Sequence, residues 1–285
     1  MIAASTNHRP HHVWAQPLAA PEAGGRCRER VERETTRPVV VVPCFNEERR
    51  LDPQGFLGLG SQGIELLFVD DGSTDNTRAA LGRLCSQLGA HGVAARLLSL
   101  DRNGGKGDAI RRGMLSALEA GASILGYFDA DLATPPAELM RLVNTLTVRP
   151  ADVVLGARVV LLGSAIQRRS ARHYLGRVFA TAAACILGIP VYDTQCGAKV
   201  FRRTAALEQA LSQPFAGRWA FDVELLGRLH AGTRTVPGVP LSRFVEVPLH
   251  EWRDVSGSTL TALAFPLLGI ELVRIAFALR DWRSR

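Results

Sequence analysis

The sequence has few cysteines, and none of them forms a paired motif. Its five cysteines are Cys27, Cys44, Cys85, Cys185 and Cys196, and no two are arranged as CxxC. An odd number of widely spaced cysteines indicates neither a zinc site nor a disulfide framework. We therefore expect a protein of a reducing compartment.

Long apolar runs are also missing. A membrane-spanning helix needs about 20 consecutive apolar residues, and the two longest uncharged runs, 178–192 and 255–270, are interrupted by proline or glycine. The N-terminal residues contain no apolar segment of the kind that a secretory signal has. We predict a protein that stays in the cytoplasm, with residues 1–37 as a disordered basic extension.

Lysine is almost absent. Only Lys106 and Lys199 are lysines among 34 basic residues, and the remaining 32 are arginines. The net charge is +7, with 47% hydrophobic and 21% charged residues among 285. This composition indicates a globular chain and excludes a mostly disordered or collagen-like one.

Short apolar runs alternate with segments of helical periodicity from residue 39 onward. Strands are predicted at 39–42, 64–69, 93–100, 124–128 and 153–157, and helices at 77–88, 106–120 and 135–146. This alternation is typical of parallel βαβ units with helices on both faces of the sheet. Because the carboxyl ends of parallel strands form the ligand crevice, we expect the polar clusters that follow the strands to converge. They lie at 46–47, 70–71, 102–106 and 129–131.

Asp129 and Asp131 leave a predicted strand one residue apart. Two carboxylates in this position suit Mg²⁺ or Mn²⁺, whose coordination is usually completed by substrate phosphates. A solvated aspartate turn is the alternative. The nearby Asp70 and Asp71 favour a site, because several acids at one buried edge repel each other unless a cation or ligand meets them.

Three further segments carry candidate chemistry, each with a structural alternative. The glycine-rich segment 102–107 contains Lys106 and is typical of an anion cradle, or of a turn that caps a basic helix. Lys199 ends the polar segment 193–199, for which a polar strand entry is the alternative. Trp219 and Asp222 lie three residues apart at a predicted helix start, where they suit a sugar site, although core packing explains the aromatic residues equally well.

Six motifs in order resemble the inverting family 2 glycosyltransferases, and within them the polyprenyl-phosphate sugar synthases. VPCFNEE at 42–48, VDDGSTD at 69–75, NGGKG at 103–107 and DAD at 129–131 resemble the family's nucleotide-sugar half. DTQCGAKVF at 193–201 and WAFDVELL at 219–226 are similar to the dolichyl-phosphate β-glucosyltransferase branch. DLATPP at 131–136 is closer to the dolichyl-phosphate mannose synthases, so GDP-mannose is the alternative donor.

The resemblance implies a GT-A fold over residues 38–250, with a Rossmann-like, mostly parallel sheet between helices. It implies a UDP-sugar donor, with Asp70 and Glu47 at the uracil and ribose, Lys106 near the pyrophosphate, and Mg²⁺ or Mn²⁺ on Asp129 and Asp131. The nucleotide-sugar set is Pro43, Asn46, Glu47, Asp70, Asp71, Lys106, Asp129, Ala130 and Asp131. The catalytic set is Asp129, Asp131, Asp193 and Asp222.

The segment between Asp152 and Asp193 contains five arginines and no acidic residue. A helix from Arg168 would place an apolar stripe beside basic side chains, which favours an anionic membrane surface or a lipid phosphate. A solvated helix face and nucleic acid are the alternatives, but no recognised nucleic-acid-binding module accompanies the arginines, and we expect no nucleic acid partner. The predicted acceptor-phosphate set is Arg158, Arg168, Arg169, Arg172, Gln195 and Lys199.

The predicted reaction moves a hexose, expected to be glucose, from a UDP-sugar to a polyprenyl or dolichyl phosphate. Such a phosphate is mostly dianionic at neutral pH and needs no general base, whereas a hydroxyl acceptor would need Asp222 or Asp193. A non-catalytic nucleotide-sugar-binding protein at the membrane is the alternative from another class. We expect residues 251–285 to form amphipathic helices at the cytoplasmic face of the membrane.

Overall fold

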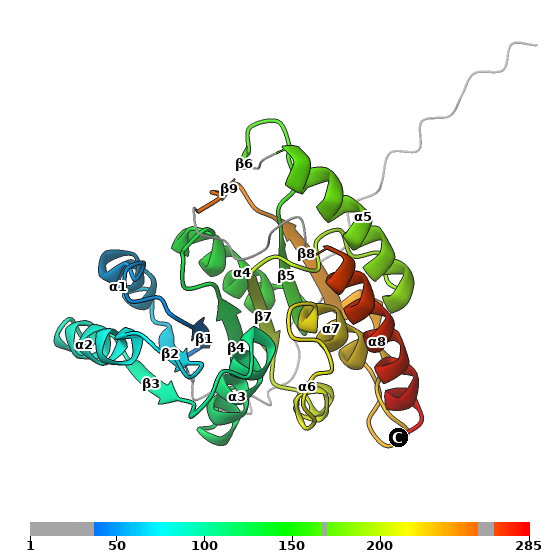
Figure 1. The fold of residues 1–285 in the computed structure, drawn as a ribbon, viewed down its shortest axis with the longest axis horizontal. Helices are drawn as coiled ribbons and strands as arrows, with labels where there is room; N and C mark the ends of the chain where they lie inside the picture. Colours follow the sequence, from blue (N-terminus) through cyan, green and yellow to red (C-terminus); the bar gives the residue numbers. More distant parts are fainter. Residues whose placement is uncertain (1–36, 167–169, 256–264) are drawn as a thin grey trace, which may run out of the picture. The chain divides into compact units, whose positions relative to one another are not determined.

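A seven-stranded sheet in the order β3-β2-β1-β4-β7-β5-β8 forms the centre of the computed structural model (Figure 1). The structure describes residues 37–166, 170–255 and 265–285. For residues 170–176 and 265–268 it describes the backbone and not the side chains. Neighbouring strands are parallel except around β7, which is antiparallel to both β4 and β5. The strands are β1 (Val39–Cys44), β2 (Glu65–Asp70), β3 (Ala95–Ser99), β4 (Ile124–Phe128), β5 (Val153–Ala157), β7 (Ala198–Arg202) and β8 (Phe244–Pro248).

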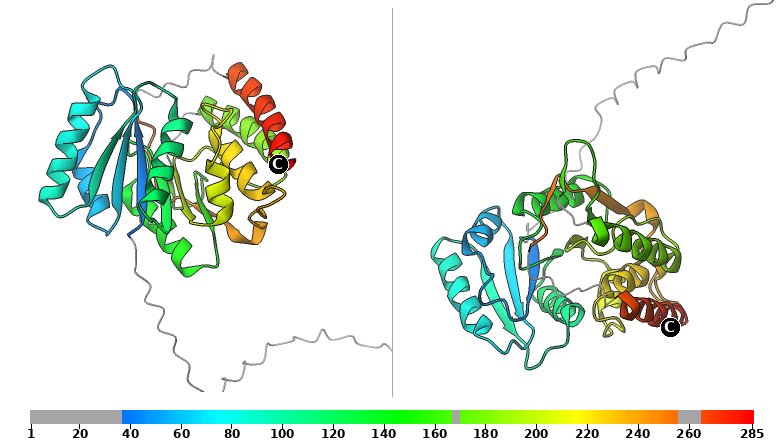
Figure 2. Two further views of the ribbon diagram at one scale, coloured as in Figure 1. Left: turned by 90° about the horizontal axis from the view of Figure 1, so that it is seen from below. Right: turned by 45° about the horizontal axis from the view of Figure 1, so that its top comes forward.

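Helices cover both faces of the sheet, because alternate strand residues enter two separate cores. Val40 and Val42 pack with α1, α2 and α4, whereas Val39 and Val41 pack with α3 and α5 to α8. Figure 2 shows α1 and α2 beside strands β1 to β3, with α8 next to α5 and α7. The helices are α1 (Pro53–Gly60), α2 (Thr77–Ala90), α3 (Lys106–Glu119), α4 (Pro136–Val148), α5 (Ser170–Leu187), α6 (Ala205–Leu211), α7 (Phe221–Ala231) and α8 (Phe265–Arg283).

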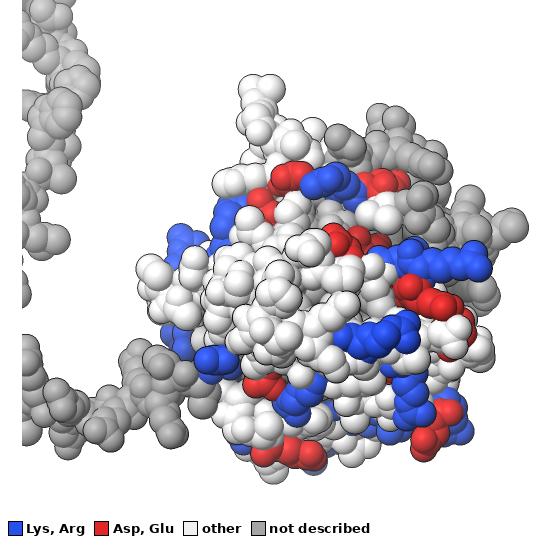
Figure 3. Space-filling model, turned by 90° about the vertical axis from the view of Figure 1, so that its left-hand side faces the viewer, with Lys and Arg blue, Asp and Glu red and all other residues white. Residues whose placement is uncertain are grey.

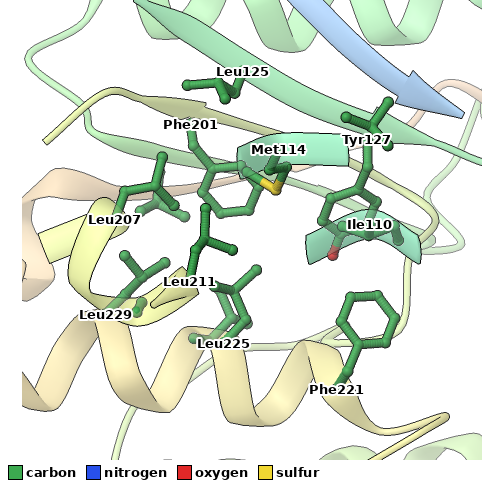
Figure 4. Packing of buried hydrophobic residues seen from close by; sticks show 14 of the residues in the cluster. Ile110, Met114, Leu125, Tyr127, Phe201, Leu207, Leu211, Phe221, Leu225 and Leu229 are labelled. Atoms are coloured by element: carbon green, nitrogen blue, oxygen red, sulfur yellow. The ribbon is translucent and has the colours of Figure 1, made fainter. Parts of the chain in front are cut away.

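Aromatic side chains close the core under the candidate site (Figure 4). The rings of Tyr127 in β4 and Phe201 in β7 stack with their centroids 6.0 Å apart. Phe221, the first residue of α7, lies 5.8 Å from Tyr127, again between ring centroids. This packing positions the start of α7, and therefore Asp222, against β4.

The predicted strands and helices between residues 39 and 157 are confirmed, with ends that differ by at most two residues. The polar-strand alternative for the segment around Lys199 is also correct, because this residue lies in β7. Helix α1, helix α6 and strand β8 were not predicted. Two short strands, β6 (Ala165–Ile166) and β9 (Glu251–Trp252), form a second sheet.

The C-terminal helix α8 packs against α7 and α5. Its inner face buries Leu272, Ile275, Leu279 and Trp282. In the described ranges, no helix has the length and apolar character needed to cross a bilayer. On the opposite side of the sheet, where α1 and α2 lie, basic and acidic side chains are interspersed (Figure 3).

Candidate active site

A cavity of about 620 Å³ lies at the carboxyl ends of β1, β2 and β4. The four polar clusters that follow the strands meet there, as their positions in the sequence predict. This donor half of the lining contains Pro43, Glu47, Asp71, Asn103, Lys106, Asp129, Ala130 and Asp131. The other half, called the acceptor half below, contains Arg158, Arg177, Tyr192, Asp193, Gln195, Arg218, Trp219, Asp222 and Trp252.

Asp129 and Asp131 lie just beyond the end of β4. The Nζ atom of Lys106, at the start of α3, is 2.6 Å from Oδ1 of Asp129. A Cβ atom on Gly197 would lie only 2.0 Å from Oδ2 of Asp129, so a larger residue at this position would displace the carboxylate. Oδ1 of Asp131 accepts a 3.0 Å hydrogen bond from the backbone N–H of Ala133.

The carboxylates near the end of β4, in the corner of the cavity formed by Asp129, Asp131 and Glu47, bring unfavourable negative charges together. Burial raises the pKa of Asp131, and the charge of Asp129 raises it further. Burial also raises the pKa of Glu47, although its bond to Arg50 has the opposite effect. Burial lowers the pKa of Lys106, but the negative charges of Asp129 and Asp222 raise it by more. Lys106 is therefore a cation.

The donor set of this corner fits a divalent cation. Carboxylate oxygens are the ligands that Mg²⁺ and Mn²⁺ prefer, and a cation would relieve the repulsion that raises the pKa of Asp131. Within the described ranges, no three acidic, histidine or cysteine side chains lie close enough together to hold a metal ion. Oxygens from the substrate would therefore complete the coordination of a cation on Asp129 and Asp131.

Asp70 and Asp71 occupy different environments. Asp71 lines the cavity, and its two oxygens accept hydrogen bonds of 2.8 Å from the backbone N–H groups of Gly104 and Gly105. Asp70 is buried outside the lining and accepts a 3.1 Å bond from the N–H of Ser73. Asn46 is also outside the lining, and its Oδ1 accepts from the backbone and the hydroxyl of Thr74. The predicted nucleotide contacts of Asp70 and Asn46 stay predictions.

Lys199 forms a buried ion pair below the cavity. Its side chain is 0% exposed, and its Nζ is 2.7 Å from Oδ1 of Asp222 and 2.5 Å from the carbonyl oxygen of Cys196. The Tyr127 hydroxyl donates to the same Asp222 oxygen, and burial together with Asp222 raises the pKa of Tyr127 well above its usual value. β7 directs this side chain into the core and outside the cavity lining, and the predicted contact between Lys199 and an acceptor phosphate stays a prediction.

Arg158, directly after β5, forms a two-point ion pair with Asp193. Nε and Nη2 of Arg158 lie 2.7 and 2.9 Å from the two Asp193 oxygens. Burial lowers the pKa of Arg158, but Asp193 raises it by more, so the guanidinium stays charged at the cavity wall. It also lies 5.4 Å from the ring centroid of Trp252. Glu246 accepts from the N–H of Asp193 at 2.7 Å and holds this segment in place.

The loop 216–220 brings Arg218 and Trp219 to the cavity. Its five consecutive backbone N–H groups donate to two carboxylates, Glu224 of α7 and Glu271 of α8. The Arg218 guanidinium then donates to Oδ1 of Asn103 at 3.0 Å, which joins the two halves of the site. The C-terminal helix thus contributes to the shape of the cavity.

Sequence reasoning did not identify Tyr192, Arg218 or Trp252 as lining residues. Arg218 directly precedes the aromatic motif 219–226, and this adjacency was the available signal. Trp252 lies in β9, which pairs with β6, and it lines the cavity from there. Arg168 and Arg169 lie outside the described residues, as does the side chain of Arg172, so their acceptor contacts stay predictions.

The family model of glycosyl transferase family 2 matches residues 39–208. The chain therefore belongs to glycosyl transferase family 2. Among its relatives, the human dolichyl-phosphate beta-glucosyltransferase is 33% identical over 269 residues, which cover 86% of this chain and 76% of that protein. The polyprenol monophosphomannose synthase of Mycolicibacterium smegmatis is 28% identical over 235 residues, which cover 82% of this chain and 86% of that one.

Solved structures share the fold. S. aureus TarS 1–349 in complex with UDP has a TM-score of 0.52 and 17% identity over 86% of this chain. The mannosyltransferase PcManGT from Pyrobaculum calidifontis, in complex with GDP-Man and Mn2+, has a TM-score of 0.51 and 17% identity over 87% of this chain. This chain spans 65% of each of those chains. The expected GT-A-like, mostly parallel sheet with helices is confirmed, and membrane association of the C-terminal helices stays a prediction.

Proposed function

We propose that the chain transfers glucose from UDP-glucose to a polyprenyl or dolichyl phosphate, with inversion and with the help of Mg²⁺ or Mn²⁺. The two halves of the cavity support this reaction because they differ in chemistry. Carboxylates and Lys106 line the donor half, whereas arginines and aromatic rings line the acceptor half, whose two aspartates, Asp193 and Asp222, are each paired with a cation. The names of the relatives that are about one-third identical support glucose as the sugar and dolichyl phosphate as the acceptor.

In the donor half, Asp129 and Asp131 would hold the cation. When bound, the cation would neutralise the charge that develops on the leaving nucleoside diphosphate. Lys106 places a second positive charge beside Asp129 and would bind a diphosphate oxygen. Gly197 allows the Asp129 carboxylate to keep its position against the end of β4.

The ion pairs of the two candidate bases, Asp222 and Asp193, are the observation that favours one acceptor over the other. Asp222 is paired with Lys199 and Asp193 with Arg158, each at 2.7 Å. Both Asp193 oxygens accept from Arg158, and Oδ1 of Asp222 accepts from Lys199 and from the Tyr127 hydroxyl, so these bonds compete with a sugar hydroxyl for the two carboxylates. A lipid phosphate needs no base, since its oxygens are already ionised at neutral pH. The site therefore favours a phosphate acceptor over a sugar hydroxyl.

We place the acceptor at the cytoplasmic face of a membrane. Val178 of α5 and Ile270, Val273 and Phe277 of α8 are exposed large apolar residues, between 52% and 72% accessible. Exposed apolar side chains on helices that also bury a face against the protein are typical of interfacial binding. In this proposal, residues 38–250 carry the catalytic site and helix α8 contacts the membrane, while the predicted extension at residues 1–37 falls almost wholly outside the described residues.

The test is a transfer assay with labelled UDP-glucose, Mg²⁺ and polyprenyl phosphate. We expect labelled lipid in the organic phase, and less of it with GDP-mannose as donor. Arg158→Lys keeps the charge but loses the two-point geometry, so it should raise the KM for the acceptor about tenfold and leave the donor KM unchanged. Arg203→Lys, on an exposed ion pair with Glu208, is the matched control. No labelled lipid with either donor would contradict the proposal.

A further inference from the structure

The loop 159–164, between β5 and β6, exposes three consecutive large apolar side chains. Val160, Leu161 and Leu162 are 60%, 52% and 107% accessible. Leu162 is the most exposed large apolar residue in the described part of the chain. Single apolar residues are common on protein surfaces, but contiguous runs of them mark contact sites.

The loop is held in one conformation by its own hydrogen bonds. The N–H and the hydroxyl of Ser164 donate to the carbonyl oxygen of Leu161, at 3.0 and 2.8 Å. The Ser164 hydroxyl oxygen also accepts from the N–H of Leu161 at 2.9 Å. Gly163 adopts a φ of +86°, which a turn of this shape requires of glycine. A turn ordered in this way loses little conformational entropy when it binds.

The loop lies at the rim of the acceptor half. It begins directly after Arg158, and it leads into β6, which pairs with β9 and so with Trp252, another lining residue. Leu162 is the fourth residue after Arg158, so their Cα atoms are at most about 14 Å apart. Figure 1 and the right view of Figure 2 show this loop projecting at the end where α5 begins.

The charge of the surrounding sequence suits a membrane. Residues 153–192 contain five arginines and no acidic residue, which favours the negative surface of a cytoplasmic leaflet. Apolar side chains at the tip with Arg158 behind them match the order of a bilayer, in which the acyl region lies beneath the phosphate groups. Arg158 would then lie near the depth of lipid phosphates.

We propose that the loop 159–164 inserts its apolar tip into the lipid bilayer and so presents Arg158 to the phosphate group of the lipid acceptor. This proposal rests on the proposed function, because it assumes an acceptor whose phosphate lies at a membrane surface. Val160, Leu161 and Leu162 lie outside the cavity lining. The loop should therefore affect access to membrane-bound acceptor and not the chemical step.

The test combines vesicle binding with two acceptors. The double variant Leu161→Asp/Leu162→Asp should bind vesicles of phosphatidylcholine and phosphatidylserine about tenfold more weakly than the wild type. It should transfer glucose about tenfold more slowly to a long polyprenyl phosphate in those vesicles, and at the wild-type rate to a short, water-soluble isoprenyl phosphate. Val148→Asp, on an 84% exposed valine at the end of α4, is the matched control and should change neither measurement.

The outcomes separate the two proposals. Vesicle binding or vesicle-dependent transfer that equals the wild type overturns the role of the loop, and so does an equal loss in Val148→Asp. If the loop binds a protein instead of a membrane, the double variant would bind vesicles as the wild type does, and the proposal would again be overturned. If the wild type transfers glucose to neither acceptor, the proposed function fails, and vesicle binding alone then decides the role of the loop. An unchanged unfolding midpoint would show that the exposed substitutions leave the fold intact.

Discussion

Replacement of Lys199 by methionine would leave the carboxylate of Asp222 buried without its cation. The Lys199 side chain is 0% exposed and that of Asp222 is 6% exposed, with 2.7 Å between Nζ and Oδ1. Methionine has a similar length and apolar character, so Lys199→Met removes the charge while keeping most of the packing of β7. The Tyr127 hydroxyl would still donate to Asp222.

The expected loss of stability follows from this burial. Removal of one partner from a buried ion pair costs about 3–5 kcal/mol, because the other charge stays in an apolar environment. In a folded unit of this size, each kcal/mol lowers the Tm by about 2–4 °C. Lys199→Met should therefore unfold about 6–20 °C below the wild type at neutral pH.

Thermal unfolding followed by circular dichroism measures the difference. Arg203→Met is the matched control, since its ion pair with Glu208 is 40% and 46% exposed and is worth at most about 1 kcal/mol. In the double variant with Asp222→Asn, the buried charge is removed, and part of the lost stability should return. A Lys199→Met midpoint within about 2 °C of the wild type, or a further loss in the double variant, would refute this account of the pair.

Two other predictions concern the site and its thiols. Gly197→Ala should lower kcat/KM for glucose transfer about 100-fold, because the new Cβ displaces the Asp129 carboxylate. Gly82→Ala is the control: its Cβ would meet no neighbouring group within 4 Å, so transfer rates should stay unchanged. Burial raises the pKa of Cys196 to about 11, so it should stay a neutral, unlabelled thiol between about pH 7 and about pH 9, while exposed Cys185 reacts with iodoacetamide. Labelling of Cys196 in the folded protein, identified by peptide mass spectrometry, would contradict the second prediction.

Local patterns in the sequence were sufficient for much of the fold. The run Val39–Val42 is buried on both faces, and β-branched residues in such a run favour a strand wherever the chain places them. The donor half followed from the same logic, because polar clusters after parallel strands must meet at one edge of the sheet. The short helix α6 and the strand β8, seven and five residues long, were not predicted.

Local patterns in the sequence did not predict which charged and polar side chains contact one another. Lys199 and Asp222 are 23 residues apart in the sequence, Arg158 and Asp193 are 35 apart, and Tyr127 and Asp222 are 95 apart. The Lys199 contact depends on how β7, an antiparallel strand in an otherwise parallel sheet, enters between β4 and β5, and the other two contacts join β4 and the end of β5 to segments far along the chain. Spacing along the chain therefore did not indicate that Lys199 points into the core.

The residues themselves specify the chemistry of this protein: a pair of aspartates after a strand, a lysine in a glycine-rich turn, and arginines in an acid-free segment. These features depend on residue type and on local order, which are complete in the sequence. The folded chain decides which of the charges are available to a substrate. Asp222, Asp193 and Asp129 carry the same group and each pairs with a cation, yet the side chains of Asp222 and Asp193 are 6% and 9% exposed whereas that of Asp129 is 32% exposed, because burial is a property of contacts in space.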